Sequence, residues 1–405
     1  TGNASTALRL GGRVEQNSNS FLAQVSGWGL EGAMQVRPDD SAAVMGLWGW
    51  NVQAFAHRNW WGPGWQSSLV NGHNTTPWMG LGFQRGSSAA SSSKWLSWMG
   101  PWSLDVFVAK AQDPFVTTEQ ASGYLFSGMR LTMKPTDWLE VGLSRGLQTG
   151  GSGRPGGGKN FFKAFLGQET NQDPDSPFQD SSNQLAGYDV RVRCPQWLGA
   201  CAAYGQMMGE DSVGKAFPLP YRFMNLAGFE KVLAQGRHRV FVEYADTFTP
   251  AWPDKTLRIP GYTNSFYQQG YTNGARWIGS AQGGASRVTT LGWLDAERNM
   301  LVKLHNGHIG MSLGSHDPDV NAPKGSLTAL SVRRTFDMYS WRLTPELSLM
   351  QLSEGQDIGA NKRKNTALID NITAIHWQLM GQIGQSVRRN VCKVSGMTIT
   401  SRSSP

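Results

Sequence analysis

The chain lacks several features that define common protein classes. Its 405 residues contain no run of 18 or more apolar residues, which excludes a transmembrane helix. Charged residues make up only 16 % and apolar residues only 39 %, which is low for a protein with a large compact core. The three cysteines and the histidines show no zinc-ligand spacing. The remaining way to cross a bilayer is a closed β-barrel, because its strands pair every backbone group.

Glycine and tryptophan are abundant where other apolar residues are few. The chain has 49 Gly, well above the usual share of about 7 %. It also has 17 Trp, and these amphipathic rings suit a lipid–water boundary. Glycine suits the bends of crowded, tilted strands. This composition favours a membrane barrel.

Alternating segments recur along the chain. In Trp102–Ala109, Trp102, Leu104, Val106 and Val108 share one face of an expected strand. Further segments with this pattern are 123–134, 137–148, 184–193, 202–209, 225–233, 237–246, 287–294, 300–308, 327–336 and 339–351. Short connections (136–137 and 235–236) alternate with long ones (147–180, 247–274 and 314–325), which is typical of outer-membrane barrels.

These patterns predict an all-β fold, a transmembrane antiparallel β-barrel of roughly 16–18 strands whose lumen is occluded by loops. We expect the barrel to span residues 1–387, with an inserted plug segment near 56–77. The basic, Ser-rich tail 388–405 has no strand pattern, and we expect it to be irregular and outside the barrel.

Seven motifs occur in an order that resembles a known family. The most unusual is the stretch from His57 to Leu69, HRNWWGPGWQSSL. The others are WMGPW (98–102), GMRL (128–131), GLSR (142–145), NQLAGYD (183–189), YGQ (204–206) with GED (209–211), and EYADT (243–247). Over residues 20 to 300 the chain resembles the Wzi family of capsule-assembly outer-membrane proteins.

The resemblance implies a monomeric surface lectin in the outer membrane of a Gram-negative bacterium. Its lumen would be occluded, and its outer face would bind capsular or extracellular polysaccharide and anchor it to the cell. The net charge of +8, rich in Arg, is consistent with an acidic polymer. Outer-membrane lipid is the other expected partner, and we expect no nucleic acid, metal, cofactor or enzymatic activity.

The tryptophan-rich stretch allows two interpretations. Trp60, Trp61 and Trp65 could form a platform on which sugar rings stack, flanked by Arg58, Asn59 and Gln66. The same indoles could instead fill the lumen as a plug, each N–H finding a partner. The second interpretation is favoured because a barrel of this size needs its interior filled.

Other candidate sugar contacts lie on expected strands and loops. Arg85, Arg130 and Arg145 could form a basic lumen or mouth, or they could pair with lumen carboxylates such as Asp189. The aromatic candidates in the 247–274 loop are Trp252, Tyr262 and Tyr267.

Two rival functions compete with the lectin hypothesis. A diffusion channel for sugars or anions would use the same fold. A soluble carbohydrate-processing enzyme would need two paired carboxylates. Glu243 and Asp246 are three residues apart on one expected strand, so they should point to opposite faces.

A disulfide is sterically reasonable between Cys194 and Cys201, which flank a short connection between two expected strands. The periplasm would permit this bond. Cys392 would remain unpaired.

Overall fold

The computed structural model describes most of the chain. The described residues are 4–16, 19–30, 33–112, 123–166, 182–212, 220–250, 258–264, 267, 269–274, 276–310, 325–338, 341–353, 372–381, 393–394 and 398–403. No helix in this part of the chain is long and apolar enough to cross a membrane.

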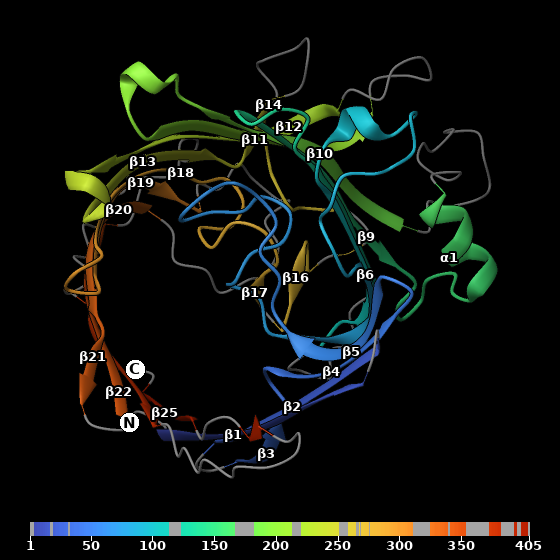
Figure 1. Ribbon diagram of the computed structural model, residues 1–405, viewed down its shortest axis with the longest axis horizontal. Helices are drawn as coiled ribbons and strands as arrows, with labels where there is room; N and C mark the ends of the chain where they lie inside the picture. Colours follow the sequence, from blue (N-terminus) through green and yellow to red (C-terminus); the bar gives the residue numbers. More distant parts are fainter. Residues whose placement is uncertain are drawn as a thin grey trace, which may run out of the picture.

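One sheet of antiparallel strands forms a ring (Figure 1). Its strands in chain order are β1 (Ala4–Gln16), β2 (Asn19–Leu30), β3 (Ala33–Arg37), β4 (Ser41–Leu47), β5 (Trp50–His57), β6 (Trp78–Arg85), β7 (Trp102–Lys110), β8 (Leu125–Met133), β9 (Leu139–Thr149), β10 (Ser182–Arg193), β11 (Cys201–Ser212), β12 (Pro220–Leu233), β13 (His238–Asp246), β18 (Arg287–Asp295), β19 (Met300–Ile309), β20 (Gly325–Arg334), β21 (Phe336–Met338), β22 (Trp341–Ser353), β23 (Ile372–Gly381), β24 (Lys393–Val394) and β25 (Thr398–Ser403).

The ring closes between the two ends of the chain. β25 pairs with β23 on one side and with β1 on the other. Three positions in the wall are shared by two strands each: β3 and β4 beside β2, β20 and β21 beside β22, and β24 and β25 beside β1. The 21 described strands of this sheet therefore occupy 18 positions. This confirms the predicted antiparallel barrel and its expected strand number.

The end of the chain differs from the prediction. Residues 388–405 were expected to be irregular, but this tail supplies β24 and β25, which complete the wall. Thr6 pairs with Ser401, and Ala4 pairs with Ser403. The physical reason is closure: without this strand, the edges of β1 and β23 would carry unpaired backbone groups in lipid.

The two faces of the wall differ in polarity. In β13, Val242 and Tyr244 are exposed on the outside, whereas Phe241, Glu243 and Ala245 are buried on the inside. The same alternation exposes Met79, Leu81 and Phe83 in β6. Apolar side chains therefore face outward to lipid, as the sequence predicts for a membrane-spanning barrel.

The connections at the two rims differ in length. At one rim most of them are short, as at 48–49, 134–138 and 296–299, although the connection 86–101 is longer. At the other rim they are long, as at 58–77 and 247–286. In barrels of this kind the short turns lie in the periplasm and the long loops lie outside the cell, so we call these the periplasmic rim and the external rim.

The periplasmic rim carries a belt of tryptophans. Among the described residues, the most exposed tryptophans all lie in or beside its connections: Trp48, Trp95, Trp98, Trp138 and Trp197. Such a belt is typical of the lipid–water interface.

A disulfide joins Cys194 and Cys201 at the same rim, with 5.2 Å between their Cα atoms. It spans a turn that contains the 3-10 helix η2 (Gln196–Leu198). The N–H of Cys194 also donates to the carbonyl of Cys201 at 2.8 Å. The bond therefore reinforces a turn that the strand pairing already holds together.

Smaller elements complete the described structure. They are the strands β14 (Phe248–Pro250), β15 (Arg258–Pro260), β16 (Thr272–Asn273) and β17 (Arg276–Trp277), the helix α1 (Gly158–Phe165), and the 3-10 helices η1 (Ser97–Met99) and η3 (Ala234–Gly236).

Candidate functional site

Residues 58–77, which we call the plug, leave β5 at the external rim and pass through the interior of the barrel. Leu69 and Val70 in the plug are fully buried with wall residues such as Phe107 and Phe126 in one apolar cluster. The main apolar core therefore lies inside the ring of strands (Figure 1).

The tight turn of the plug depends on glycine. A Cβ atom at Gly64 would lie 2.3 Å from the carbonyl oxygen of Ser67.

One carboxylate of the wall holds the backbone of the plug. Glu243 in β13 accepts hydrogen bonds from the backbone N–H groups of Trp65 at 2.6 Å, Gln66 at 3.2 Å and Ser67 at 2.7 Å. The hydroxyl of Tyr204 in β11 donates to the same carboxylate at 3.1 Å. With acceptor contacts to three consecutive backbone N–H groups, Glu243 is a polar anchor of the plug.

Two of the three plug indoles, those of Trp61 and Trp65, contact the inner face of the wall. Trp61 is 3 % exposed, and its Nε1–H donates to Asp105 at 3.2 Å. Trp65 donates to Glu230 and stacks on Phe241, with 5.4 Å between ring centroids. The structure therefore places Trp61 and Trp65 as lumen-filling side chains rather than as a sugar platform.

Gln66 also contacts the wall, because Lys303 in β19 donates to its side-chain oxygen at 2.8 Å. It is thus separated from the other polar candidates of the tryptophan-rich stretch, Arg58 and Asn59, which lie where the plug leaves β5.

The described residues of the 247–286 connection cover the plug. Tyr262 donates to the carbonyl of Leu69 at 2.8 Å, and Tyr271 donates to that of Val70 at 3.0 Å. Tyr267 donates to the carbonyl of Gly150 at 3.2 Å. Tyr262 is 0 % exposed and Tyr267 is 2 % exposed. Neither tyrosine can contact sugar in this arrangement, because both are used to close the lumen. Trp252 lies outside the described residues.

The three candidate arginines are not brought together. Arg130 faces the lumen and forms two hydrogen bonds with Asp189, at 2.6 and 2.9 Å, and one with Ser144 at 2.7 Å. It therefore follows the interpretation in which lumen arginines pair with carboxylates. Arg191 likewise pairs with Glu230.

Arg85 and Arg145 lie on the outer face of the wall. Arg85 continues the outward row of Leu81 and Phe83 at the periplasmic rim, where its guanidinium lies 3.9 Å from the ring centroid of Trp102. Arg145 continues the outward row of Val141 and Leu143. The expectation that they line a lumen or mouth is wrong, because strand alternation turns both side chains outward.

A different group of polar and aromatic residues gathers at the external rim. Arg58 donates to the carbonyl of Thr75 at 2.7 Å, and the rings of Trp60 and His73 lie 5.1 Å apart. Asn74 donates to the carbonyl of Trp277 in β17, which brings the exposed Arg276 to the same part of the mouth. We call Arg58, Asn59, Trp60, His73 and Arg276 the mouth cluster.

The mouth cluster is cationic and partly accessible. Arg58, Asn59 and Trp60 are half-buried, whereas His73 and Arg276 are exposed. Although His73 is exposed as a residue, partial desolvation of its ring lowers its pKa, and the positive charge of Arg58 lowers it further, against a raising effect of Asp40. His73 and Arg276 were missed at the sequence level. The polar run that begins at His73 was the available signal.

The described residues contain no group of three or more His, Cys, Asp or Glu side chains that could hold a metal ion. The donors of the mouth cluster are instead guanidinium, amide and indole groups, which suit sugar hydroxyls and carboxylates.

Comparison with known proteins agrees with this architecture. Residues 4–353 match the family described as capsule assembly protein Wzi. An uncharacterized 55.8 kDa protein in the cps region of Klebsiella pneumoniae is 36 % identical over 193 residues, which is 47 % of this chain and 36 % of that protein. The chain thus covers about a third of the length of that relative.

A solved structure has the same fold. It is Wzi of Escherichia coli, described as an outer membrane protein involved in group 1 capsule assembly and as a carbohydrate-binding β-barrel. The TM-score is 0.65 at 20 % identity, with 98 % of this chain and 83 % of that chain covered. The fold is therefore that of an outer-membrane β-barrel, and the family match extends over most of the chain: the chain belongs to the capsule assembly protein Wzi family.

Proposed function

We propose that this protein is an outer-membrane lectin that binds capsular or extracellular polysaccharide at its external rim and anchors it to the cell surface. The single observation that carries the proposal is the plug packed inside the barrel. The plug and the described residues of the 247–286 connection fill the part of the interior beside β5–β12, and the mouth cluster lies on the external side of this packing. Family membership supports the same role.

The chemistry of the mouth cluster fits an acidic polymer. The half-buried indole of Trp60 offers an apolar face to a sugar ring, and Arg58 and Arg276 place guanidinium groups, a type that suits carboxylates and hydroxyls, in the same mouth. Each contact of this kind is weak and hydrated, so retention would come from many repeat units engaging several protein molecules. We propose that each molecule acts as a monomer surrounded by outer-membrane lipid.

The diffusion-channel alternative is opposed by the anchoring of the plug. A channel needs a continuous water-filled path, whereas Glu243 holds the plug by three backbone N–H groups across the lumen. The anchored plug therefore favours the lectin over the channel, and a conductance measurement distinguishes the two.

We propose no catalytic activity. Glu243 is buried against the plug on the inner face of β13, whereas Asp246 binds Arg287 at 2.9 Å on the opposite face. Glycoside hydrolysis needs two carboxylates that face the same bond. These two carboxylates do not meet that requirement.

Binding of purified protein to immobilised capsular polysaccharide of the source bacterium tests the proposal. We expect Trp60→Ala to weaken binding about tenfold, since loss of one stacking contact costs on the order of 1–2 kcal/mol. Trp48→Ala is the matched control, because Trp48 is exposed at the periplasmic rim. Equal binding by wild type and Trp60→Ala, or equal loss in both variants, would contradict the assignment of the mouth cluster.

A further inference from the structure

The connection after β9 folds back over the outside of the barrel. Its helix α1 lies outside the ring of strands (Figure 1) and packs against β9. Leu147 in β9 and Ser127 in β8 occupy outward positions, since their neighbours Gln148 and Phe126 face the lumen. Leu147 is nevertheless only 1 % exposed, and Ser127 is only 2 % exposed. A patch of the lipid-facing wall is therefore covered by protein near the external rim.

Arg145 holds the helix on this outer face. Its guanidinium donates to the carbonyl of Ala164 at 2.7 Å and to that of Phe165 at 2.5 Å. These are carbonyls of the last turn of α1, where a cation is favourable. Ala164 is fully buried, so α1 has a defined docked face.

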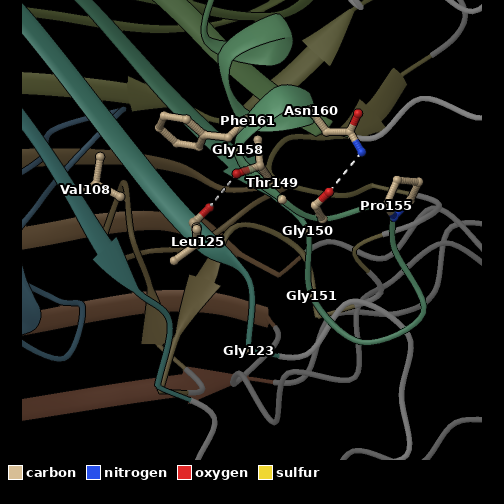
Figure 2. A pocket seen from close by; sticks show the side chains of 12 residues that line it. Val108, Gly123, Leu125, Thr149, Gly150, Gly151, Pro155, Gly158, Asn160 and Phe161 are labelled. Carbon is tan, nitrogen blue, oxygen red and sulfur yellow. Dashed lines mark hydrogen bonds between the residues drawn. The ribbon is translucent and has the colours of Figure 1, made fainter.

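A pocket of about 420 Å³ lies between this connection and the wall (Figure 2). Val108 of β7, Leu125 of β8 and Phe161 of α1 line it, together with glycines at 150–151 and 156–158. Val108 and Leu125 face outward, because Phe107 and Phe126 beside them belong to the interior cluster. The pocket therefore lies on the lipid side of the barrel, and its size is typical of sites that bind small molecules, about 300–1,000 Å³.

The surroundings of the pocket are apolar on one side and cationic on the other. Phe162 and Leu166 are 62 % and 67 % exposed, beside the lipid-facing strands. Lys159 in α1 is exposed, as is Lys110, which lies two residues beyond Val108 on the same face of β7. Residues 150–166 contain Arg154, Lys159 and Lys163 but no Asp or Glu. An amphipathic helix with this composition suits the boundary between acyl chains and anionic headgroups.

We propose that this pocket holds one acyl chain of an anionic lipid from the external leaflet, with the phosphate of its headgroup beside Lys110 and Lys159. The continuity of the pocket with the lipid-facing wall and the charge of its rim carry the assignment. The proposal rests on the membrane-spanning barrel and is independent of polysaccharide binding.

Native mass spectrometry of the purified barrel in detergent tests the pocket. We expect one tightly retained phosphatidylglycerol molecule, and about tenfold weaker retention of phosphatidylcholine with the same chains. Leu125→Trp fills the pocket and should abolish the retained lipid. Leu143→Trp, on the lipid face of β9 outside the pocket, should keep it.

A second pair of variants tests the same proposal with less disturbance of the wall. At Gly156, which lines the pocket, an added Cβ would meet nothing within 4 Å, so Gly156→Leu should fold and weaken retention. Lys110→Gln combined with Lys159→Gln should remove the preference for phosphatidylglycerol, whereas Lys94→Gln at the periplasmic rim should keep it. Wild-type retention in Leu125→Trp and Gly156→Leu would overturn the proposal, as would equal retention of both lipids by the wild type.

Discussion

At the residue scale, the state of the lumen depends on few polar contacts. Glu243 is buried and accepts backbone hydrogen bonds from three consecutive residues of the plug, Trp65, Gln66 and Ser67. Each of these donors would be left without an acceptor if the carboxylate were removed. A buried donor without a partner costs about 1–3 kcal/mol.

Glu243→Ala should therefore destabilise the plug by several kcal/mol, on the order of the cost of two or three unpaired donors. The temperature of the heat-dependent shift in gel mobility should fall. Glu297→Ala is the control, because Glu297 pairs with Arg237 in an exposed turn. An exposed ion pair contributes about 0–1 kcal/mol. A Glu243→Ala protein as heat-stable as the control would contradict the anchoring role.

At the element scale, Arg145 is the polar side chain that holds α1 on the outer wall. Arg145 contacts the last carbonyls of α1 and also donates to the side-chain oxygen of Gln184 in β10. Hydrogen bonds that involve a charged donor contribute about 1.5–3 kcal/mol each.

Arg145→Ala should release α1 from the wall. Trypsin should then cut after Lys159 and Lys163 at least about tenfold faster than in the wild type, since local opening exposes the backbone. Arg193→Ala, at an exposed position near the periplasmic rim, should leave the rate unchanged. An unchanged rate in Arg145→Ala would show that other contacts hold the helix.

The sequence was sufficient to predict the strands, but it was not sufficient to predict the contacts of the loops. Alternation predicted the strand that begins at Trp102, and the same alternation could have placed Arg85 and Arg145 outside, since each continues a row of outward apolar residues. The burial of Tyr262 and Tyr267 was not predictable, because it depends on contacts with residues more than 100 positions away. The strand at Thr398–Ser403 was missed because it is Ser- and Thr-rich, with apolar character only at Ile399.

At the scale of the whole molecule, the fold separates three environments. The outer wall carries exposed apolar side chains for lipid, the plug and its covering connection pack inside the barrel against β5–β12, and the external rim carries the mouth cluster. The proposed polysaccharide binding is therefore assigned to the external rim.

The closed lumen is the claim on which this account depends most, and conductance across a planar bilayer tests it directly. Wild-type protein inserted from detergent should give no steady open channel, and Glu243→Ala should give conducting events as the plug is released. Glu297→Ala should remain silent. A steady, ohmic conductance of the wild-type protein would contradict the account and would favour a diffusion channel.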